Sequence, residues 1–455
     1  MPDLLATHIA DLALNTFTSL PTKCKPRTLA DGSREWTPMS AVALNYSSSL
    51  SITSAPNGSQ LHSGNIQLIS LATGTKSLPV SALPKCKGLV LHDCHAEILA
   101  LRGLNYWLLT EVERLLSDDE YKSQWLEVIS STRSGSTSQP PFRFRQGVEL
   151  SLFSTEAPCG DASMELLMAA SEAAGKDISP WPTAAIHKDA SSISGKALPL
   201  GRGCFSDLGA LRRKPARADA EISMSKSCTD KLMLKQFTGL LGFPLDLLIQ
   251  HSPETFLRRF IVYREQYSEE GYARAFGSEG RLKTGFASKG MDWGVLARFF
   301  EVCTLPSDFR RFGFEKQRGM QEVNTKSKVS NTSALWIAGG GSQQSTAVVE
   351  ILVNGVKQGF KQFDEQERKG SVICRRIMIQ KAVQLQRLVQ IRGMAPADPD
   401  NGLLCNYSRL KSSHSHGHKK NLKQLVLASL GGWPKEYPKD EFEIDLPPLQ
   451  CSNDS

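Results

Sequence analysis

The chain has 455 residues, 40% of them hydrophobic, with 54 Lys and Arg against 46 Asp and Glu. This apolar fraction is enough for a continuous core and excludes intrinsic disorder as the dominant state. The formal net charge of +8 favours a polyanionic partner, without choosing among nucleic acid, a phosphorylated ligand and a membrane surface.

The N-terminal segment lacks the basic start of a secretory signal, and no run of about 18 apolar residues occurs. We therefore expect an intracellular protein, in the cytoplasm, the nucleus or both, without a membrane partner. The ten cysteines are too few and too irregularly spaced for a disulfide scaffold. Most are expected to be reduced and buried, with only a subset acting as ligands.

The first strongly periodic segment runs from Asp93 to Leu116, and Asp93 is suited to cap it as a helix. We expect this helix to begin close to His95. A second unit consists of a strand from Val148 to Phe153, a turn through Pro158, and a helix that starts near Cys159 and ends at Gly175. The Ser- and Pro-rich residues 130–144 between the two units predict a surface loop.

Residues 176–225 are irregular and rich in Gly, Pro and Arg, which is long for a structureless loop and indicates a binding role. Beyond them, residues 333–338 resemble a strand, and Asn354-Gly355 predicts a tight hairpin turn. A helix from about Ser371 to Arg392 and a basic segment leading into a last helix and a Trp-containing tail complete the chain. We find no internal repeats and no linker that divides the sequence into independent domains.

Two polar clusters, each at a predicted helix start, carry the chemistry. A His-x-Glu pair at His95 and Glu97 and a Pro-Cys pair ending in Cys159 are typical of zinc deaminases, in which one His and two Cys hold Zn²⁺. The usual second cysteine three residues later is Ala162 here, and Cys228 is the best replacement. Such a ligand set leaves Zn²⁺ an open position for water, and Glu97 would move protons without binding the metal.

Each of these residues also has an ordinary structural interpretation. His-x-Glu pairs are common by chance, and an isolated cysteine is usually buried and inert. Three histidines spaced by two, at 414, 416 and 418, imitate a metal site but fit a solvated loop better. Cys94 is expected to pack in the core, because adjacent residues of a helix point away from each other. A helix N-terminus near Cys159 would favour its thiolate form.

Taken together, the segments HDCHAE at 92–97, PCGD at 158–161 and SCTDK at 227–231 resemble the adenosine deaminase domain shared by tRNA-specific and double-stranded-RNA adenosine deaminases. The similarity continues at residues 33–44, 74–79, 212–220 and 431–442. It implies a single domain over residues 20–445, with terminal extensions at 1–19 and 446–455. The implied fold is α/β, a cytidine-deaminase-like mixed sheet with flanking helices, enlarged by a C-terminal helical region that encloses a polyphosphate ligand.

By this resemblance, His95, Cys159 and Cys228 are zinc ligands and Glu97 is the proton shuttle. The sequence leaves no obvious room for double-stranded-RNA-binding domains, which favours the tRNA branch and conversion of adenosine 37 of alanine tRNA to inosine. A deaminase acting on duplex RNA and a catalytically silent, zinc-stabilised RNA-binding protein are the alternatives. Glu97 argues against the silent protein, because a structural zinc site needs no proton shuttle. No obligatory protein partner is evident.

The resemblance also implies buried inositol hexakisphosphate, whose phosphates demand many cationic donors. The matching positions are Arg102, Ser225, Lys231, Arg375, Tyr407, Lys411, Trp433, Lys435 and Asp440, while the alignment around Lys419 and Lys420 is uncertain by a few residues. Leu101 and Leu234 stand where the RNA-editing relatives carry Arg, and His92 replaces an Asn. These departures predict fewer contacts to the ligand, or none.

RNA contacts are predicted at the entrance to the base pocket, where basic groups meet phosphates of the anticodon loop. Thr75, Lys76, Lys214 and Arg217 are the residues proposed for this entrance. The ordinary alternative for the basic residues is that they form solvated helix faces. For the Trp and Tyr of the polyphosphate set, it is that they are core aromatics.

Overall fold

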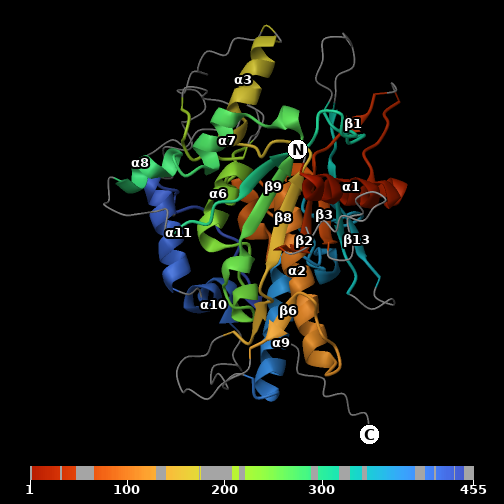
Figure 1. The fold of residues 1–455 in the computed structure, drawn as a ribbon. Helices are drawn as coiled ribbons and strands as arrows, with labels where there is room; N and C mark the ends of the chain where they lie inside the picture. Colours follow the sequence, from red (N-terminus) through yellow and green to blue (C-terminus); the bar gives the residue numbers. More distant parts are fainter. Residues whose placement is uncertain are drawn as a thin grey trace, which may run out of the picture.

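The computed structural model describes residues 3–30, 33–47, 66–129, 140–173, 175, 207–214, 221–287, 296–316, 328–340, 346–394, 405–414, 417–434 and 436–444. A twisted sheet of eight strands runs through the centre, in the order β10-β9-β8-β2-β3-β12-β13-β14. The pairs β10–β9 and β9–β8 are parallel and the remaining pairs are antiparallel, so the sheet is mixed. Helices cover both of its faces (Figure 1).

The strands of this sheet are short and mostly apolar. They are β2 (Met39–Tyr46), β3 (Ile66–Thr73), β8 (Val148–Ser154), β9 (Leu257–Val262), β10 (Glu301–Thr304), β12 (Thr332–Ile337), β13 (Val348–Val353) and β14 (Val356–Lys357). In β2, at the middle of the sheet, every residue except the last is buried, because side chains on both faces meet a packed layer. Its register with β8 pairs Ala41 with Phe153.

The long helix α2 (Ala96–Ser117) lies on one face and packs against β2, β3 and β12. Leu99, Leu104, Trp107 and Leu108 enter the larger hydrophobic core there. Helix α9 (Arg375–Ile391) packs against the outer side of α2, so α2 is buried on most of its circumference. This burial holds the first turn of α2, which carries the predicted chemistry, in a fixed position.

Helix α1 (Leu4–Ser19) covers the opposite face of the sheet and contributes to a second core. Asp3 caps it by accepting hydrogen bonds from the backbone N–H groups of Leu5 and Ala6. Phe17 meets Phe312 and Phe314 edge to face. The helix lies in the span predicted as an N-terminal extension, and it packs directly on β2, β3 and β8.

The remaining elements surround one end of the sheet or connect its strands. The other helices are α3 (Met164–Ala173), α6 (Cys228–Thr238), α7 (Glu269–Phe276), α8 (Arg281–Ala287), α10 (Tyr407–His414) and α11 (Gly417–Ser429). Short 3₁₀ turns are η1 (Thr22–Cys24), η4 (Val80–Lys85), η5 (Asp161–Ser163), η6 (Leu245–Leu247), η7 (Pro253–Thr255), η8 (Arg264–Gln266) and η10 (Glu367–Lys369). Two-stranded ribbons pair β1 (Glu35–Trp36) with β11 (Lys328–Val329), β4 (Thr75–Ser77) with β5 (Asp93–His95), β6 (Leu126–Val128) with β7 (Phe142–Phe144), and β15 (Cys405–Asn406) with β16 (Glu443–Ile444). Helix α11 packs against α6 and α8 on the left side of Figure 1.

Several sequence predictions are confirmed, namely the helix after His95, the strand from Val148, the strand over 333–338 and the hairpin at Asn354-Gly355. The helix predicted to start near Cys159 begins only at Met164, after η5. The helix predicted from Ser371 begins at Arg375, and part of the predicted loop over 130–144 is strand β7. Among the described residues, no helix is long and apolar enough to cross a membrane.

Candidate active site

His95 stands where β5 ends and α2 begins. Its strand pairs with β4, in the register Thr75 to His95, and the His95 backbone N–H donates to Asp93 Oδ1 at 3.0 Å. Gly74 precedes β4 with a φ of +139°, and a Cβ there would lie 2.3 Å from the Cys94 carbonyl oxygen. Only glycine allows this close approach, which places β4 beside the strand that carries His95.

Cys159 lies in the turn after β8. The next residue, Gly160, has a φ of +115°, and a Cβ there would meet the Ser227 side chain at 2.4 Å. The turn therefore packs directly against the start of α6. The backbone N–H of Thr229 donates to the Cys159 carbonyl at 3.0 Å, and that of Cys228 points at the Cys159 sulfur at 3.4 Å.

Cys228 is the first residue of α6, and its place is set by a helix cap. The Ser227 side chain accepts a hydrogen bond from the Asp230 backbone N–H at 3.0 Å. The Asp230 carboxylate in turn accepts from the Ser227 hydroxyl at 2.6 Å and from the Arg212 backbone N–H at 2.8 Å. Arg281 pairs with the same carboxylate at 2.8 Å, so this N-terminus is tied to three other segments.

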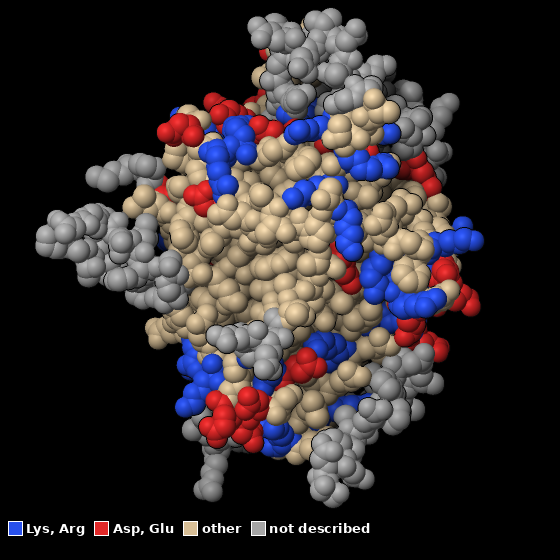
Figure 2. All heavy atoms as spheres, turned by 90° about the vertical axis from the view of Figure 1, so that its right-hand side faces the viewer, with Lys and Arg blue, Asp and Glu red and all other residues tan. Residues whose placement is uncertain are grey.

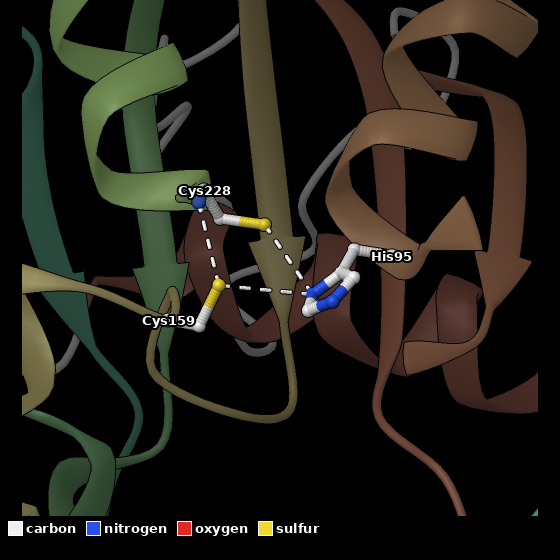
Figure 3. Close-up of side chains that lie close together, drawn as sticks. All are labelled: His95, Cys159 and Cys228. Carbon is white, nitrogen blue, oxygen red and sulfur yellow. Dashed lines mark hydrogen bonds between the residues drawn. The ribbon is translucent and has the colours of Figure 1, made fainter. Parts of the chain in front are cut away.

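The three predicted ligands converge from these separate elements (Figure 3). His95 Nδ1 lies 3.7 Å from the sulfur of Cys159 and 3.7 Å from that of Cys228. All three donor atoms lie within 4.8 Å of one another; His95 and Cys228 are buried and Cys159 is half-buried. One imidazole nitrogen and two thiols in this arrangement fit a tetrahedral Zn²⁺ with its fourth position open.

Lys214 is buried beside the two sulfurs, where the sequence does not predict it. Its ammonium lies 2.7 Å from Cys228 Sγ and 3.5 Å from Cys159 Sγ. The pKa of the Cys159 thiol is held well below its usual value by the hydrogen bond with Cys228 and by the nearby charges of Lys214 and His95. The Lys214 cation and the Cys228 backbone N–H therefore favour the Cys159 thiolate, a role that the sequence analysis gave to a helix N-terminus at Cys159. Lys214 was predicted to contact RNA, and in this structure its side chain is fully buried.

Glu97 lies in the first turn of α2, two residues after His95, and is buried. Burial raises the pKa of its carboxyl group, and the neighbouring charge of Lys214 opposes this rise. A carboxylate at this place, close to the ligand set but not part of the group that faces the metal position, suits a group that takes up and returns protons.

Behind the ligands lies a cavity of about 260 Å³, lined by aliphatic residues and by several charged ones. Asp93 separates the two sites: its carboxylate accepts from Lys231 and from the Ser225 hydroxyl, and lies 3.5 Å from the Lys214 ammonium. Burial alone would raise the pKa of Asp93, but Lys214 and Lys231 outweigh burial and hold that pKa well below its usual value. The same carboxylate therefore contacts one cation of the active site and one of the cavity.

Most of the predicted polyphosphate residues gather at or near this cavity. Arg102, Ser225, Lys231 and Arg375 line it. Tyr407 stacks on Phe442, with the Lys411 ammonium 5.7 Å from its ring, and the Lys226 ammonium lies 3.9 Å from the Trp433 ring. Lys435 lies outside the described residues. Of the two leucines at predicted Arg positions, Leu234 lines the cavity and Leu101 is buried in the core.

His92, Asp440 and Cys86 form a second group with metal-ligand chemistry at the edge of the cavity. His92 Nε2 lies 2.9 Å from Asp440 Oδ2. The Arg375 guanidinium, however, is 2.7 Å from the same nitrogen and 3.1 Å from the same carboxylate oxygen. A permanent cation already sits where a metal would bind, so this group orients Arg375 toward the cavity and is not a metal site.

The remaining RNA-contact predictions fall on β4 or outside the described residues. Thr75 and Lys76 are half-buried on β4, next to the strand that ends at His95, so they lie beside the active site. Arg217 lies outside the described residues. On the face turned to the viewer in Figure 2, a broad central area shows no Lys or Arg among the described residues.

Two lysines that line the cavity, Lys226 and Lys423, were not predicted from the sequence, and neither was Lys235 in the last turn of α6. A signal was present, since Lys231 and Lys235, and likewise Lys419 and Lys423, are four residues apart and share one face of their helices. The sequence alone does not show that the faces of α6 and α11 meet.

The mixed sheet, the convergent His-Cys-Cys group and the buried Glu after the His define a deaminase of nucleobases. The sequence profile of the adenosine-deaminase (editase) domain matches residues 70–437. The chain belongs to this family and is an enzyme that deaminates adenosine.

Relatives in several organisms agree with this assignment. The tRNA-specific adenosine deaminase 1 of Schizosaccharomyces pombe is 31% identical over 382 residues, which cover 83% of this chain and 85% of that protein. The enzyme of the same name in Saccharomyces cerevisiae is 33% identical over 53% of this chain and 54% of its own length. The double-stranded RNA-specific editase B2 of Rattus norvegicus is 33% identical over 22% of this chain and 12% of its own length.

Proposed function

We propose that the protein hydrolyses adenosine to inosine in tRNA with the help of Zn²⁺, and that its target is adenosine 37, next to the anticodon of alanine tRNA. The observation that carries the proposal is the meeting of His95, Cys159 and Cys228 at one site, with the buried Glu97 two residues after His95. The tRNA substrate is supported by the relatives, because the tRNA-specific enzyme of Schizosaccharomyces pombe aligns along 83% of the chain and the duplex-RNA editase along 22%.

In this mechanism, each protein group has a defined task. His95, Cys159 and Cys228 would hold Zn²⁺, which, when bound, would supply a Lewis acid that activates water near neutral pH. Glu97 accepts the proton of that water and delivers it to the purine ring nitrogen beside the reacting carbon. A second proton transfer through the same carboxylate lets the amino group leave as ammonia. The Lys214 ammonium, 3.5 Å from the Cys159 sulfur and 2.7 Å from the Cys228 sulfur, favours the loss of protons from these ligands.

We propose in addition that the cavity behind the zinc site holds inositol hexakisphosphate. The support is electrostatic: Arg102, Lys231, Arg375 and Lys423 line the same cavity, and the one Asp in that lining already accepts from Lys231. Burial and mutual repulsion with Lys411 lower the pKa of Lys423 to about 8. Cations gathered in this way need a ligand of high negative charge, and polar partners such as Ser225 complete a phosphate site.

The activity is tested with purified protein and unmodified alanine tRNA, followed by mapping of inosine. Wild type should form inosine at position 37, and a tRNA with guanosine there should remain unchanged. Glu97→Gln should lower the rate by about 10²–10⁴-fold with normal zinc content, as expected for a lost general acid–base group. Glu172→Gln, at an exposed position in α3, is the matched control and should be fully active. Editing confined to long duplex RNA would refute the tRNA assignment.

A further inference from the structure

An aspartate follows each cysteine ligand at the same distance, and the zinc chemistry proposed above gives it no task. The two segments are CGD at 159–161, after β8, and CTD at 228–230, at the start of α6. Both aspartates are completely buried. A buried carboxylate needs partners, because its charge is costly to remove from water. The partners of these two carboxylates therefore show what holds the cysteine segments in place.

Asp161 is held by Arg274, which lies in α7. The guanidinium donates to the Asp161 carboxylate at 3.0 Å and to the Asp161 main-chain carbonyl at 2.9 Å. Its N–H groups also donate to the Glu165 carboxylate in the first turn of α3. One arginine thus contacts both the side chain and the backbone two residues after Cys159, and its three partners fix the plane of the guanidinium.

The other side of the same turn is attached to η8, just before α7. The Ala157 backbone N–H donates to the side-chain oxygen of Gln266 at 3.0 Å. The Tyr272 hydroxyl of α7 donates to the main-chain carbonyl of Gln266, also at 3.0 Å. Helix α7 packs in addition against η5. The turn that carries Cys159 is therefore held on both sides by η8 and α7.

Asp230 has the corresponding arrangement with Arg281, the first residue of α8. The two side chains form an ion pair of 2.8 Å, in which the Arg281 side chain is only 3% exposed. The guanidinium also donates to the Ala210 carbonyl at 3.3 Å. Helices α7 and α8 follow one another in the chain and lie beside α6 (Figure 1). One unit of the fold, α7 with α8, therefore contacts both cysteine segments.

A single stretch of backbone joins the two aspartates. The Gly209 N–H donates to the Asp161 carboxylate at 2.7 Å. The Arg212 N–H donates to the Asp230 carboxylate at 2.8 Å. Two residues further on lies Lys214, whose ammonium contacts both ligand sulfurs. The two carboxylates therefore fix the cysteine segments and the backbone that carries this cation relative to one another.

Stability alone does not explain these two ion pairs. Replacing a buried ion pair by packed hydrophobic side chains is often neutral or stabilising, because both charges lose their hydration on burial. The arginines add orientation, since the N–H groups of a guanidinium hold the carboxylate that they contact in one direction. Each carboxylate lies two residues from a sulfur, where a small displacement would change the distance of 3.7 Å between that sulfur and His95 Nδ1.

We propose that Arg274 and Arg281 are positioning residues of the metal site: each holds, through one buried aspartate, the segment that presents one cysteine sulfur to the metal. This inference rests on the zinc site proposed above and gives a role to two residues outside it. Without either arginine, both sulfurs would still be present but one of them would be less precisely placed. Groups that support metal ligands typically contribute about 10–100-fold to metal affinity, and we expect a loss of this size for each arginine.

The test is titration of the metal-free, full-length protein with Co²⁺, whose absorption reports both thiolate ligation and tetrahedral geometry. Arg274→Gln and Arg281→Gln should each weaken Co²⁺ binding by about 10–100-fold and lower the intensity of the d–d bands. Arg274→Lys keeps a positive charge beside Asp161 without the planar guanidinium, so it should fold like wild type and bind Co²⁺ with intermediate affinity. This variant keeps the inference testable if loss of the charge prevents folding.

Arg259→Gln is the matched control. Arg259 forms an ion pair with Glu149 between β9 and β8, both side chains are mostly buried, and neither residue belongs to a cysteine segment. The control should lose comparable stability in urea and keep the Co²⁺ affinity and spectrum of wild type. Unchanged Co²⁺ binding in all three variants at Arg274 and Arg281, or equal weakening in Arg259→Gln, would overturn the positioning role alone. If wild type itself shows no thiolate–cobalt absorption, the zinc proposal is overturned, and this inference with it.

Discussion

Lys214 shows how much a single side chain adds to the zinc site. Its ammonium lies within 2.7 Å of one sulfur and 3.5 Å of the other, so it favours both thiolates over thiols. Lys214→Met should lower zinc affinity by about 10–100-fold, the usual effect of removing a group that supports metal ligands. The loss should grow as the pH falls from 8 to 6, because thiols of higher pKa bind protons in competition with the metal.

Competition with a chromophoric chelator measures this affinity, on protein whose fold is verified by circular dichroism. Lys283→Met, far out on the surface of α8, provides the comparison and should leave zinc binding unchanged. Equal affinity and equal pH dependence in Lys214→Met and wild type would show that the ammonium does not support the thiolates.

At the scale of single residues, the sequence predicted the residues with reactive side chains and missed Lys214, which supports the two sulfurs. His95, Glu97 and Cys159 carry motif spacing and residue chemistry that are visible in one dimension, and Cys228 is identified by the resemblance of its segment SCTDK. Lys214 carries neither, and an isolated Lys is normally assigned to the surface. Its burial depends on Asp93 and the two sulfurs arriving from three other segments, and that arrangement exists only in the folded chain.

At the scale of elements, we expect the loss of the α6 cap to affect zinc affinity more than it affects the stability of the fold. Ser227→Ala removes the side chain that accepts from Asp230 N–H and should lower the free energy of unfolding by about 1 kcal/mol. Because Cys228 is the next residue, zinc affinity should fall as well. Ser268→Ala removes the equivalent cap of α7 and should show a similar loss of stability with unchanged zinc affinity.

Urea unfolding and chelator competition on both variants separate the two effects. If Ser268→Ala and Ser227→Ala weakened zinc binding equally, the cap of α6 would have no special part in positioning Cys228.

Among the elements, those with strong periodicity were predicted well and the turn after β8 was not. The apolar pattern of α2 and the Asn-Gly turn of the β13–β14 hairpin act locally, so the sequence specifies them. At Cys159 the sequence looks equally helical, yet Gly160 takes a φ of +115° and delays the helix to Met164. The close contact with Ser227 on α6 imposes that conformation, and such a contact leaves no local signal.

The whole molecule is organised by one sheet with a core on each face. Helix α2, which begins after His95 and carries Glu97, belongs to the larger core and α1 to the smaller one, and strands β2 and β3 contribute to both. Since alternate residues of a strand point to opposite faces, displacing a strand disturbs both cores together. A substitution that destabilises the packing of α1 should therefore also destabilise the zinc site on the other side of the sheet.

Phe17→Ala tests this coupling. Phe17 is buried, and its ring centroid lies 5.0 Å from that of Phe312 and 5.9 Å from that of Phe314, so truncation should cost about 3–5 kcal/mol of unfolding free energy. If the two cores unfold as one unit, the midpoint of zinc release and the midpoint of helix loss in urea should move down together. Leu4→Ala, at a side chain that is 51% exposed on the same helix, should change both by less than about 0.5 kcal/mol. Zinc release that stayed at the wild-type midpoint while the helical signal shifted would show instead that the α1 face unfolds separately from the deaminase site.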